Sequence, residues 1–179
     1  RDLLLQYGEQ ASEELSACIR VQSSDVASSG ANICCFLQEG SYKRPLILGS
    51  EIKLEHTNGA TVEKFFGNLT QIFSCYQESI KNLERLFQLE IHYPDSAMEG
   101  MMKKVGIGKQ LITQTVEHFQ ATHGTGKANG YELYCGICEA VFFAQCKKTS
   151  AKNLIDLEEM VARCLSLRFE DYDFPGEYR

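Results

Sequence analysis

The sequence predicts an α+β protein that is predominantly helical: a helical bundle of about five helices with one β-hairpin near residues 32–55. Over most of the chain, apolar residues recur at intervals of three and four, which is the spacing of one face of a helix. Near residues 32–55, two runs of β-compatible residues are instead joined through a turn. About half of the chain is then helical, well above the usual third.

The first predicted elements are one amphipathic helix and the hairpin. Residues 2–21 place apolar side chains at helical intervals, at Leu4, Tyr7, Ala11, Leu15 and Cys18. The run 32–38 precedes Gly40, Ser41 and Pro45, and in the run 46–56 the residues Ile52 and Leu54 alternate with charged ones. This pattern predicts a hairpin with a connection of five or six residues and one solvated face.

The longest predicted helix spans about residues 61–91 and ends before Pro94, because the residue before a proline avoids helical angles. Its stripe alternates steps of four and three, at Val62, Phe66, Leu69, Phe73, Tyr76, Ile80, Leu83 and Phe87. Residues 95–108 are expected to form a loop or a short broken helix. Further helices are predicted over 108–122, 131–146 and 151–169, the last capped by Asn153 with Asp156.

Domain organisation follows from length. A chain of 179 residues builds one complete core, so residues 1–169 are predicted to form a single globular domain. Residues 170–179 form an acidic-aromatic tail containing Tyr172, Phe174 and Tyr178. This tail could dock on the same domain, bind another protein, or lead to a further domain. Because the chain begins with Arg1, we expect a fragment of a larger protein or complex.

Composition excludes several functions. The net charge of −6 lacks the basic excess that drives nucleic-acid binding, so nucleic acid is not expected as a partner. The longest apolar runs are far shorter than the roughly 20 residues of a membrane span, so no membrane association is predicted. The eight cysteines lie in apolar or helix-periodic contexts, which favours free buried thiols and an acidic intracellular protein, cytoplasmic or nuclear.

The stretch "YELYCGICEAVFFAQC", residues 131–146, contains the motif Cys135-x-x-Cys138. A structural zinc site needs four ligands, commonly two closely spaced pairs, and the chain supplies one such pair. Cys138, Phe142 and Cys146 stack at intervals of four, and apolar residues cover most of the helix circumference. The sequence therefore favours a buried central helix with no metal, with a zinc-stabilised module as a weaker alternative.

A glycine-rich segment supplies a second alternative. "GIGK" at Gly106, Gly108 and Lys109 fails the Walker pattern, which needs a glycine five positions before the Gly-Lys pair and Ser or Thr after it. The segment "LEIHYPDSAMEGMMKKVGIGKQLI" resembles the acetyl-CoA loop of the GNAT acyltransferases as a strand, a loop and a glycine-led helix start. That resemblance implies a small acyl-CoA-dependent transferase that binds the cofactor phosphates at Gly106–Lys109. The long helix departs from the family, because strands are expected in its place.

The function that the sequence favours is a non-catalytic intracellular protein-protein interaction or scaffold domain. The four histidines are scattered and form no local signature with a nucleophile, so enzyme activity stays open without being indicated. No cofactor is expected under this interpretation. The expected partner is another protein or a second copy of the chain, because aromatic residues supply much of the energy of interfaces.

Overall fold

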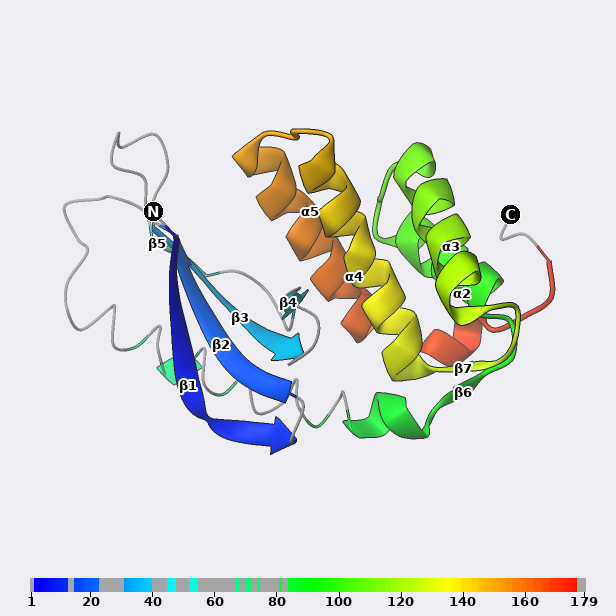
Figure 1. Cartoon of the computed structure of the whole chain (residues 1–179), viewed down its shortest axis with the longest axis horizontal. Helices are drawn as coiled ribbons and strands as arrows, with labels where there is room; N and C mark the ends of the chain where they lie inside the picture. Colours follow the sequence, from blue (N-terminus) through cyan, green and yellow to red (C-terminus); the bar gives the residue numbers. More distant parts are fainter. Residues whose placement is uncertain are drawn as a thin grey trace. The chain divides into compact units, whose positions relative to one another are not determined.

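The computed structural model describes residues 2–12, 15–22, 31–39, 45–47, 52–54, 67, 70, 71, 74, 81 and 84–176. Two compact units are present, Arg1–Lys81 and Asn82–Arg179, and each is described by itself (Figure 1). The described residues contain both strands and helices, and the second unit is mainly helical. The predicted α+β, mainly helical class is therefore confirmed. The single domain over 1–169 stays a prediction.

The first unit contains an antiparallel sheet. Strands β1 (Asp2–Ser12) and β2 (Leu15–Gln22) pair with each other, and β2 also pairs with β3 (Ala31–Glu39). The predicted helix over 2–21 is therefore wrong. Between Leu15 and Val21 every second residue is apolar, which is the period of a strand, and Ile19 and Val21 are β-branched.

The predicted hairpin is confirmed in its pairing. Strand β3 pairs antiparallel with β4 (Pro45–Ile47), after a connection of residues 40–44, and further along with β5 (Ile52–Leu54). The returning arm is thus two short strands along one edge of β3, while β2 occupies the other edge. Whether one face is solvated lies outside the described residues.

The long helix predicted over 61–91 ends earlier than expected. Helical backbone is described at 67, 70, 71, 74, 81 and 84–88, and the rest of the stripe before residue 84 lies outside the described residues. Strand β6 (Glu90–Ile91) follows and pairs antiparallel with β7 (Ala128–Asn129). Ile91 is fully buried in this ladder. A tertiary strand pairing therefore replaces the last predicted turn.

Helix α2 (Pro94–Lys104) occupies the segment predicted as a loop or a short broken helix. Pro94 begins this helix, a position where proline loses no hydrogen bond because its missing N–H would be unpaired anyway. All three of its methionines, Met98, Met101 and Met102, are fully buried. Helix α3 (Lys109–His123) lies within a residue of its predicted bounds at each end.

Helix α4 (Gly130–Cys146) follows as predicted, whereas α5 (Ala151–Arg163) begins as predicted and ends before the predicted residue 169, where two short 3-10 helices follow instead. A capping box begins α4: the Asn129 side chain accepts from the Glu132 N–H at 2.8 Å, and the Glu132 carboxylate accepts from the Asn129 N–H at 2.8 Å. Ser150 caps α5, accepting from the Asn153 N–H at 3.3 Å. The predicted cap at Asn153 is therefore three residues too late, because Ser150 is already a favourable cap.

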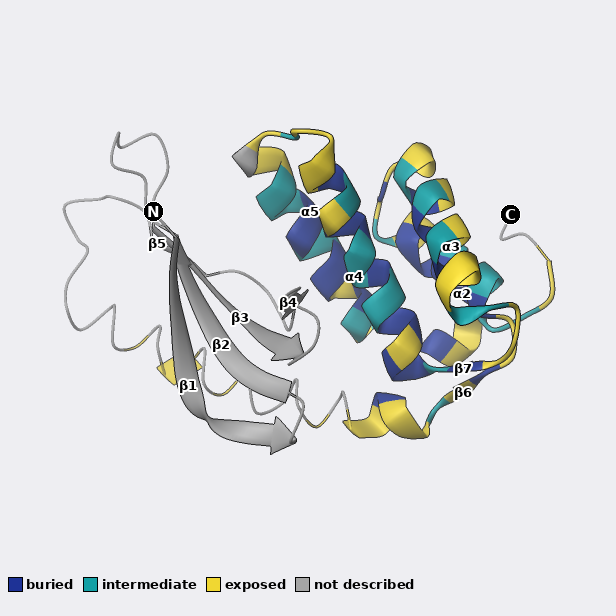
Figure 2. Ribbon diagram, in the orientation of Figure 1, coloured by how far each residue is buried: buried dark blue, intermediate teal, exposed yellow. Residues whose placement is uncertain are grey.

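The core of the second unit lies around α4, which packs against α2, α3 and α5 (Figure 2). Leu133, Tyr134 and Ile137 of this helix are fully buried. Helix α3 approaches closely at Gly136, where an added Cβ would lie 2.5 Å from Cδ2 of Phe119. The predicted central helix is confirmed, and glycine at residue 136 permits the approach.

Candidate interaction surface

The cysteines of α4 and its neighbours differ in exposure. Cys164 is buried, Cys135 and Cys138 are half-buried, Cys146 is exposed, and all four are free thiols. Burial, reinforced by the nearby Cys138 thiol, raises the pKa of Cys164 to about 12. Burial and the same thiols raise the pKa of Tyr134 well above its ordinary value. Raised pKa values suppress the reactive thiolate, so Cys164 has the properties of a structural cysteine.

One face of α4 differs from its prediction. Phe142 is 36% exposed and Cys146 is exposed, whereas Cys138 is half-buried and its thiol lies near Cys164, so the row of residues 138, 142 and 146 reaches the surface in its second half. The buried face passes through Leu133, Ile137 and Ala140 instead. Apolar composition around a helix identified a central helix but did not reveal which stripe stays at the surface.

Metal ligation was the weaker alternative for Cys135 and Cys138. Within the described part of the chain, no three or more His, Cys, Asp or Glu side chains are grouped where they could hold a metal ion. Cysteines at residues outside the described ranges are not covered by this statement.

The glycines of the GIGK segment form the end of α2. Gly106 has φ +91°, and its N–H donates to the Lys103 carbonyl at 3.1 Å. The Ile107 N–H donates to the Met102 carbonyl at 3.0 Å, and both side chains are buried. These two bonds form a Schellman motif, so the termination of α2 accounts for the glycine at residue 106.

The strand-loop-helix context of the GNAT resemblance is not observed here. Residues 94–104, which the resemblance would place in a loop, form α2. Gly108 is the N-cap of α3 and Lys109 is its first residue, so the three predicted residues do lie together at a helix start. Cofactor binding by Gly106, Gly108 and Lys109 stays a prediction.

An aromatic cluster consists of His118 of α3 with Phe142 and Phe143 of α4. The rings of Phe142 and Phe143 lie 6.0 Å apart, and the His118 ring meets Phe143 edge to face at 5.2 Å. Phe142 is the most exposed of the three. An exposed aromatic side chain that lies beside a second ring is suited to anchor an interface.

Two other large apolar side chains are exposed in the described residues. Phe87 is 45% exposed and stacks on Tyr131, with ring centroids 4.1 Å apart. Tyr93 is also 45% exposed and precedes α2. They lie near β6, whereas the aromatic cluster lies in the second half of α4, so the exposed aromatics do not form one patch.

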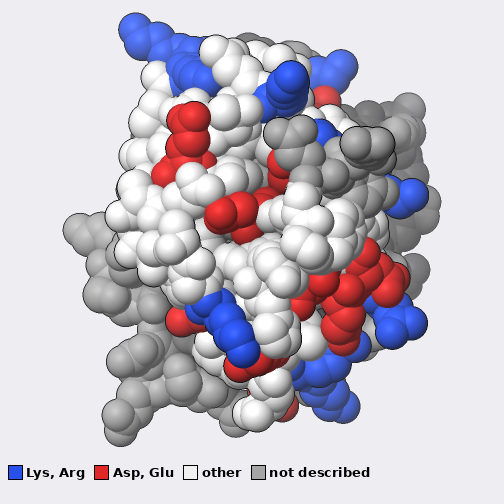
Figure 3. Space-filling model, turned by 90° about the vertical axis from the view of Figure 1, so that its right-hand side faces the viewer, with Lys and Arg blue, Asp and Glu red and all other residues white. Residues whose placement is uncertain are grey.

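Lysines gather at one end of the second unit. Pairs of residues from α3 and α4 meet in opposite chain order, His123 with Glu132 and Phe119 with Gly136, so these two helices are antiparallel. The α2–α3 turn and the α4–α5 turn therefore share one end (Figure 1). We call this the basic end; it comprises Lys103, Lys104, Lys109, Lys147, Lys148 and Lys152, all exposed. Blue side chains gather at the top of the unit in Figure 3.

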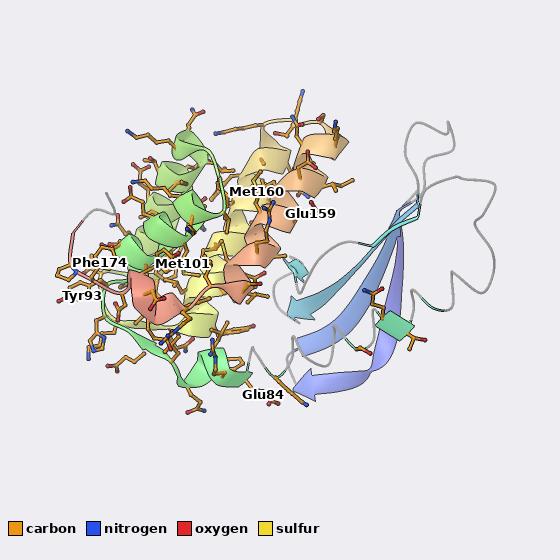
Figure 4. The ribbon with its side chains drawn as sticks, turned by 180° about the vertical axis from the view of Figure 1, so that it is seen from behind. Glu84, Tyr93, Met101, Glu159, Met160 and Phe174 are labelled. Atoms are coloured by element: carbon orange, nitrogen blue, oxygen red, sulfur yellow. The ribbon has the colours of Figure 1, made fainter. Side chains whose placement is uncertain are left out.

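The described part of the acidic-aromatic tail docks on the second unit. Tyr172 of the tail is 8% exposed, and the short 3-10 helix that it shares with the fully buried Phe169 just before the tail, η2 (Phe169–Tyr172), packs against α2. Figure 4 shows Phe174 beside Tyr93. The first of the three alternatives for the tail thus holds through residue 176.

Asp173 fastens this segment to the start of α2. Its Oδ1 accepts from the backbone N–H groups of His92 at 2.9 Å and Tyr93 at 2.7 Å, and its Oδ2 lies 3.1 Å from His92 Nδ1. Burial opposes ionisation, but the two backbone donors and the His92 ring outweigh it and lower the pKa of Asp173. Asp173 thus fixes the two residues that lead into α2, whose N-cap is Tyr93.

A charged group continues outward from His92. Its Nε2 lies 3.1 Å from Glu90 Oε1, which also accepts from Lys127 Nζ at 2.9 Å. The hydrogen bond and charge of Lys127 lower the pKa of Glu90. Because Glu90 and Lys127 are exposed, this group orders the surface near β6 and adds little stability.

Comparisons with known proteins identify no relative. No protein-family model matches the chain, and no significant match was found among curated proteins or solved structures. Among the described helices, none combines the length and apolar character needed to cross a bilayer.

Proposed function

We propose that the chain is a non-catalytic protein-protein interaction or scaffold domain, and that the aromatic cluster of α3 and α4 binds its partner. In this proposal the helices form a bundle, the protein is intracellular, and the partner is another protein or a second copy of the chain. The observation that carries the proposal is the exposed ring of Phe142, which lies beside Phe143, whose own ring meets His118. Aromatic side chains contribute strongly to binding energy when an interface desolvates them.

Rigidity of the support favours this role. Phe142 is on α4, whose neighbouring residues Val141 and Ala144 are buried. An anchor on a packed helix loses little conformational freedom when it binds, so less binding energy is offset by ordering.

Capture from cell extract by the immobilised whole chain tests the proposal. Phe142→Ala should reduce recovery of the captured protein by about tenfold or more, as expected for loss of an aromatic anchor worth at least about 1.4 kcal/mol. Gln145→Ala is the matched control, because Gln145 is exposed on the same helix less than one turn away. Equal recovery with both variants would contradict the proposal.

Solution mass separates the two kinds of partner. A dimer that Phe142→Ala converts to a monomer would identify the partner as a second copy. A monomer that captures no protein but turns over acetyl-CoA would instead support the transferase alternative at Gly106, Gly108 and Lys109.

A further inference from the structure

We infer that the basic end of the second unit binds an acidic segment of the partner protein, directly beside the aromatic cluster. This inference rests on the proposed function and adds the chemistry of the partner. Helix α4 connects the two features, because Lys147 follows Phe143 by one turn and its N–H donates to the Phe143 carbonyl at 3.3 Å.

The lysines of the basic end are largely uncompensated. Lys103 forms an ion pair with Glu99 at 2.7 Å. Among the described residues, the ammonium groups of Lys104, Lys109, Lys147, Lys148 and Lys152 have no carboxylate within ion-pair distance. Lysines brought together without nearby carboxylates create a local positive potential that attracts an anionic partner.

The local charge opposes that of the whole chain. The net charge is −6, so an acidic partner is repelled elsewhere and is oriented towards this end. Because salt screens charges beyond about 8–10 Å, the lysines of the two turns act over a small area. A short acidic segment fits such an area.

A long polyanion fits less well. Duplex DNA carries one charge per roughly 1.7 Å of its axis, so its phosphates would continue beyond the lysines over an acidic protein surface. None of the residues of the basic end is an arginine, the side chain most often used for bidentate recognition of guanine. A membrane would likewise extend beyond the patch in every direction. These arguments favour a protein segment over either alternative.

The test uses the whole chain and a fluorescein-labelled glutamate-rich peptide that ends in leucine. Wild-type protein should bind this peptide with an affinity that falls as salt is raised. Lys109→Glu combined with Lys152→Glu changes one lysine of each turn and should weaken binding by about tenfold. Both residues lie in the first turn of a helix, α3 and α5, where a carboxylate is favourable, so folding is preserved.

Arg85→Glu combined with Arg168→Glu is the control, because it makes the same change in net charge at exposed positions outside the basic end. Equal weakening by both pairs, or absence of peptide binding by the wild type, would overturn the inference. Tighter binding at equal salt to a short DNA duplex, or to vesicles of phosphatidylcholine and phosphatidylserine, would overturn the choice of partner.

The capture experiment separates this inference from the proposed function. Recovery that depends on Phe142 but not on Lys109 and Lys152 would sink the inference and leave the proposed function intact. Recovery that depends neither on Phe142 nor on the two lysines would contradict both the inference and the proposed function.

Discussion

Gly136→Ala tests the close approach of α3 and α4 on which the helical unit is built. The added Cβ would lie 2.5 Å from Cδ2 and 3.1 Å from Cε2 of Phe119, and 3.3 Å from Cε of Met98. An ordinary carbon-carbon contact is about 3.5–4.0 Å, so the Phe119 ring or the helix must withdraw by about 1 Å. Phe119 is buried and stacks on His123 at 4.8 Å, so free movement of the ring is restricted.

Two effects of opposite sign set the magnitude. Overpacking a core costs about 1–3 kcal/mol, whereas replacing glycine by alanine within a helix gains up to about 1 kcal/mol. We therefore expect a net loss of about 1–2 kcal/mol in the free energy of unfolding. For a unit of this size, each 1 kcal/mol lowers Tm by about 4–8 °C.

Thermal melting followed by circular dichroism at a helical wavelength measures this loss. Gly126→Ala is the control, because an added Cβ there meets nothing within 4 Å, and it should leave Tm nearly unchanged. Phe119→Leu should partly rescue Gly136→Ala by opening space, giving a favourable coupling in a double-mutant cycle. A Tm for Gly136→Ala at or above that of the wild type, or strict additivity of the two changes, would refute the packing described here.

Three further predictions concern other parts of the second unit. Thiol alkylation of the folded protein should modify Cys146 quickly and Cys164 only on unfolding, because burial holds the pKa of Cys164 at about 12. Mass spectrometry of digests gives both labelling rates. Rapid labelling of Cys164 would refute its burial. Gly106→Ala should lower the free energy of unfolding by about 1–2 kcal/mol in urea titration, since its φ is +91° and an L-residue is strained there; a neutral result would argue against the Schellman motif. The pKa of Asp173 is lower in the folded protein than in the unfolded chain. Its ionised form therefore stabilises the docking of residues 169–176 at pH values above the unfolded pKa, and this stabilisation is lost as the pH falls through the folded pKa. Limited proteolysis after residue 168 should accelerate under acid conditions in the wild type, and at neutral pH already in Asp173→Ala; protection unaffected by that change would rule out the fastening role.

The spacing of apolar residues predicted those helices in which the apolar face of the sequence is also the face buried in the fold. Helix α3 and helix α4 lie close to their predicted bounds because their apolar residues face the core at regular helical intervals. The hairpin of β3 with β4 was likewise visible, since a turn-forming stretch separates two β-compatible runs.

The errors have definable causes. Residues 2–21 carry helical and strand periods at once, and the register of β2 with β3 selects the strand period. Pro94 was interpreted as the end of the helix predicted over 61–91, and it is instead the first residue of α2. Proline is favourable both just after a helix and at the first position of one, so the sequence alone does not separate the two. The end of the long helix depended on a pairing of Ile91 with Ala128, which are 37 positions apart and therefore invisible to any local window.

The surface features were only partly accessible from the sequence. Phe142 was assigned to the core with its helix, because composition does not show which stripe of a helix is exposed. The paired lysines Lys103–Lys104 and Lys147–Lys148 are visible in the sequence, but only the antiparallel arrangement of α3 and α4 brings them to one end. Asp173 was seen as part of a tail, and its bonds to His92 and Tyr93 cross some 80 positions.

Chemical-shift mapping of the whole chain during titration with the glutamate-rich peptide tests the account most directly. We expect backbone shifts confined to residues 103–109 and 142–152, with ring shifts at Phe142 and Phe143. Shifts centred on β6 and the segment 169–176, or none at saturating peptide, would contradict an interaction surface formed by the aromatic cluster and the basic end.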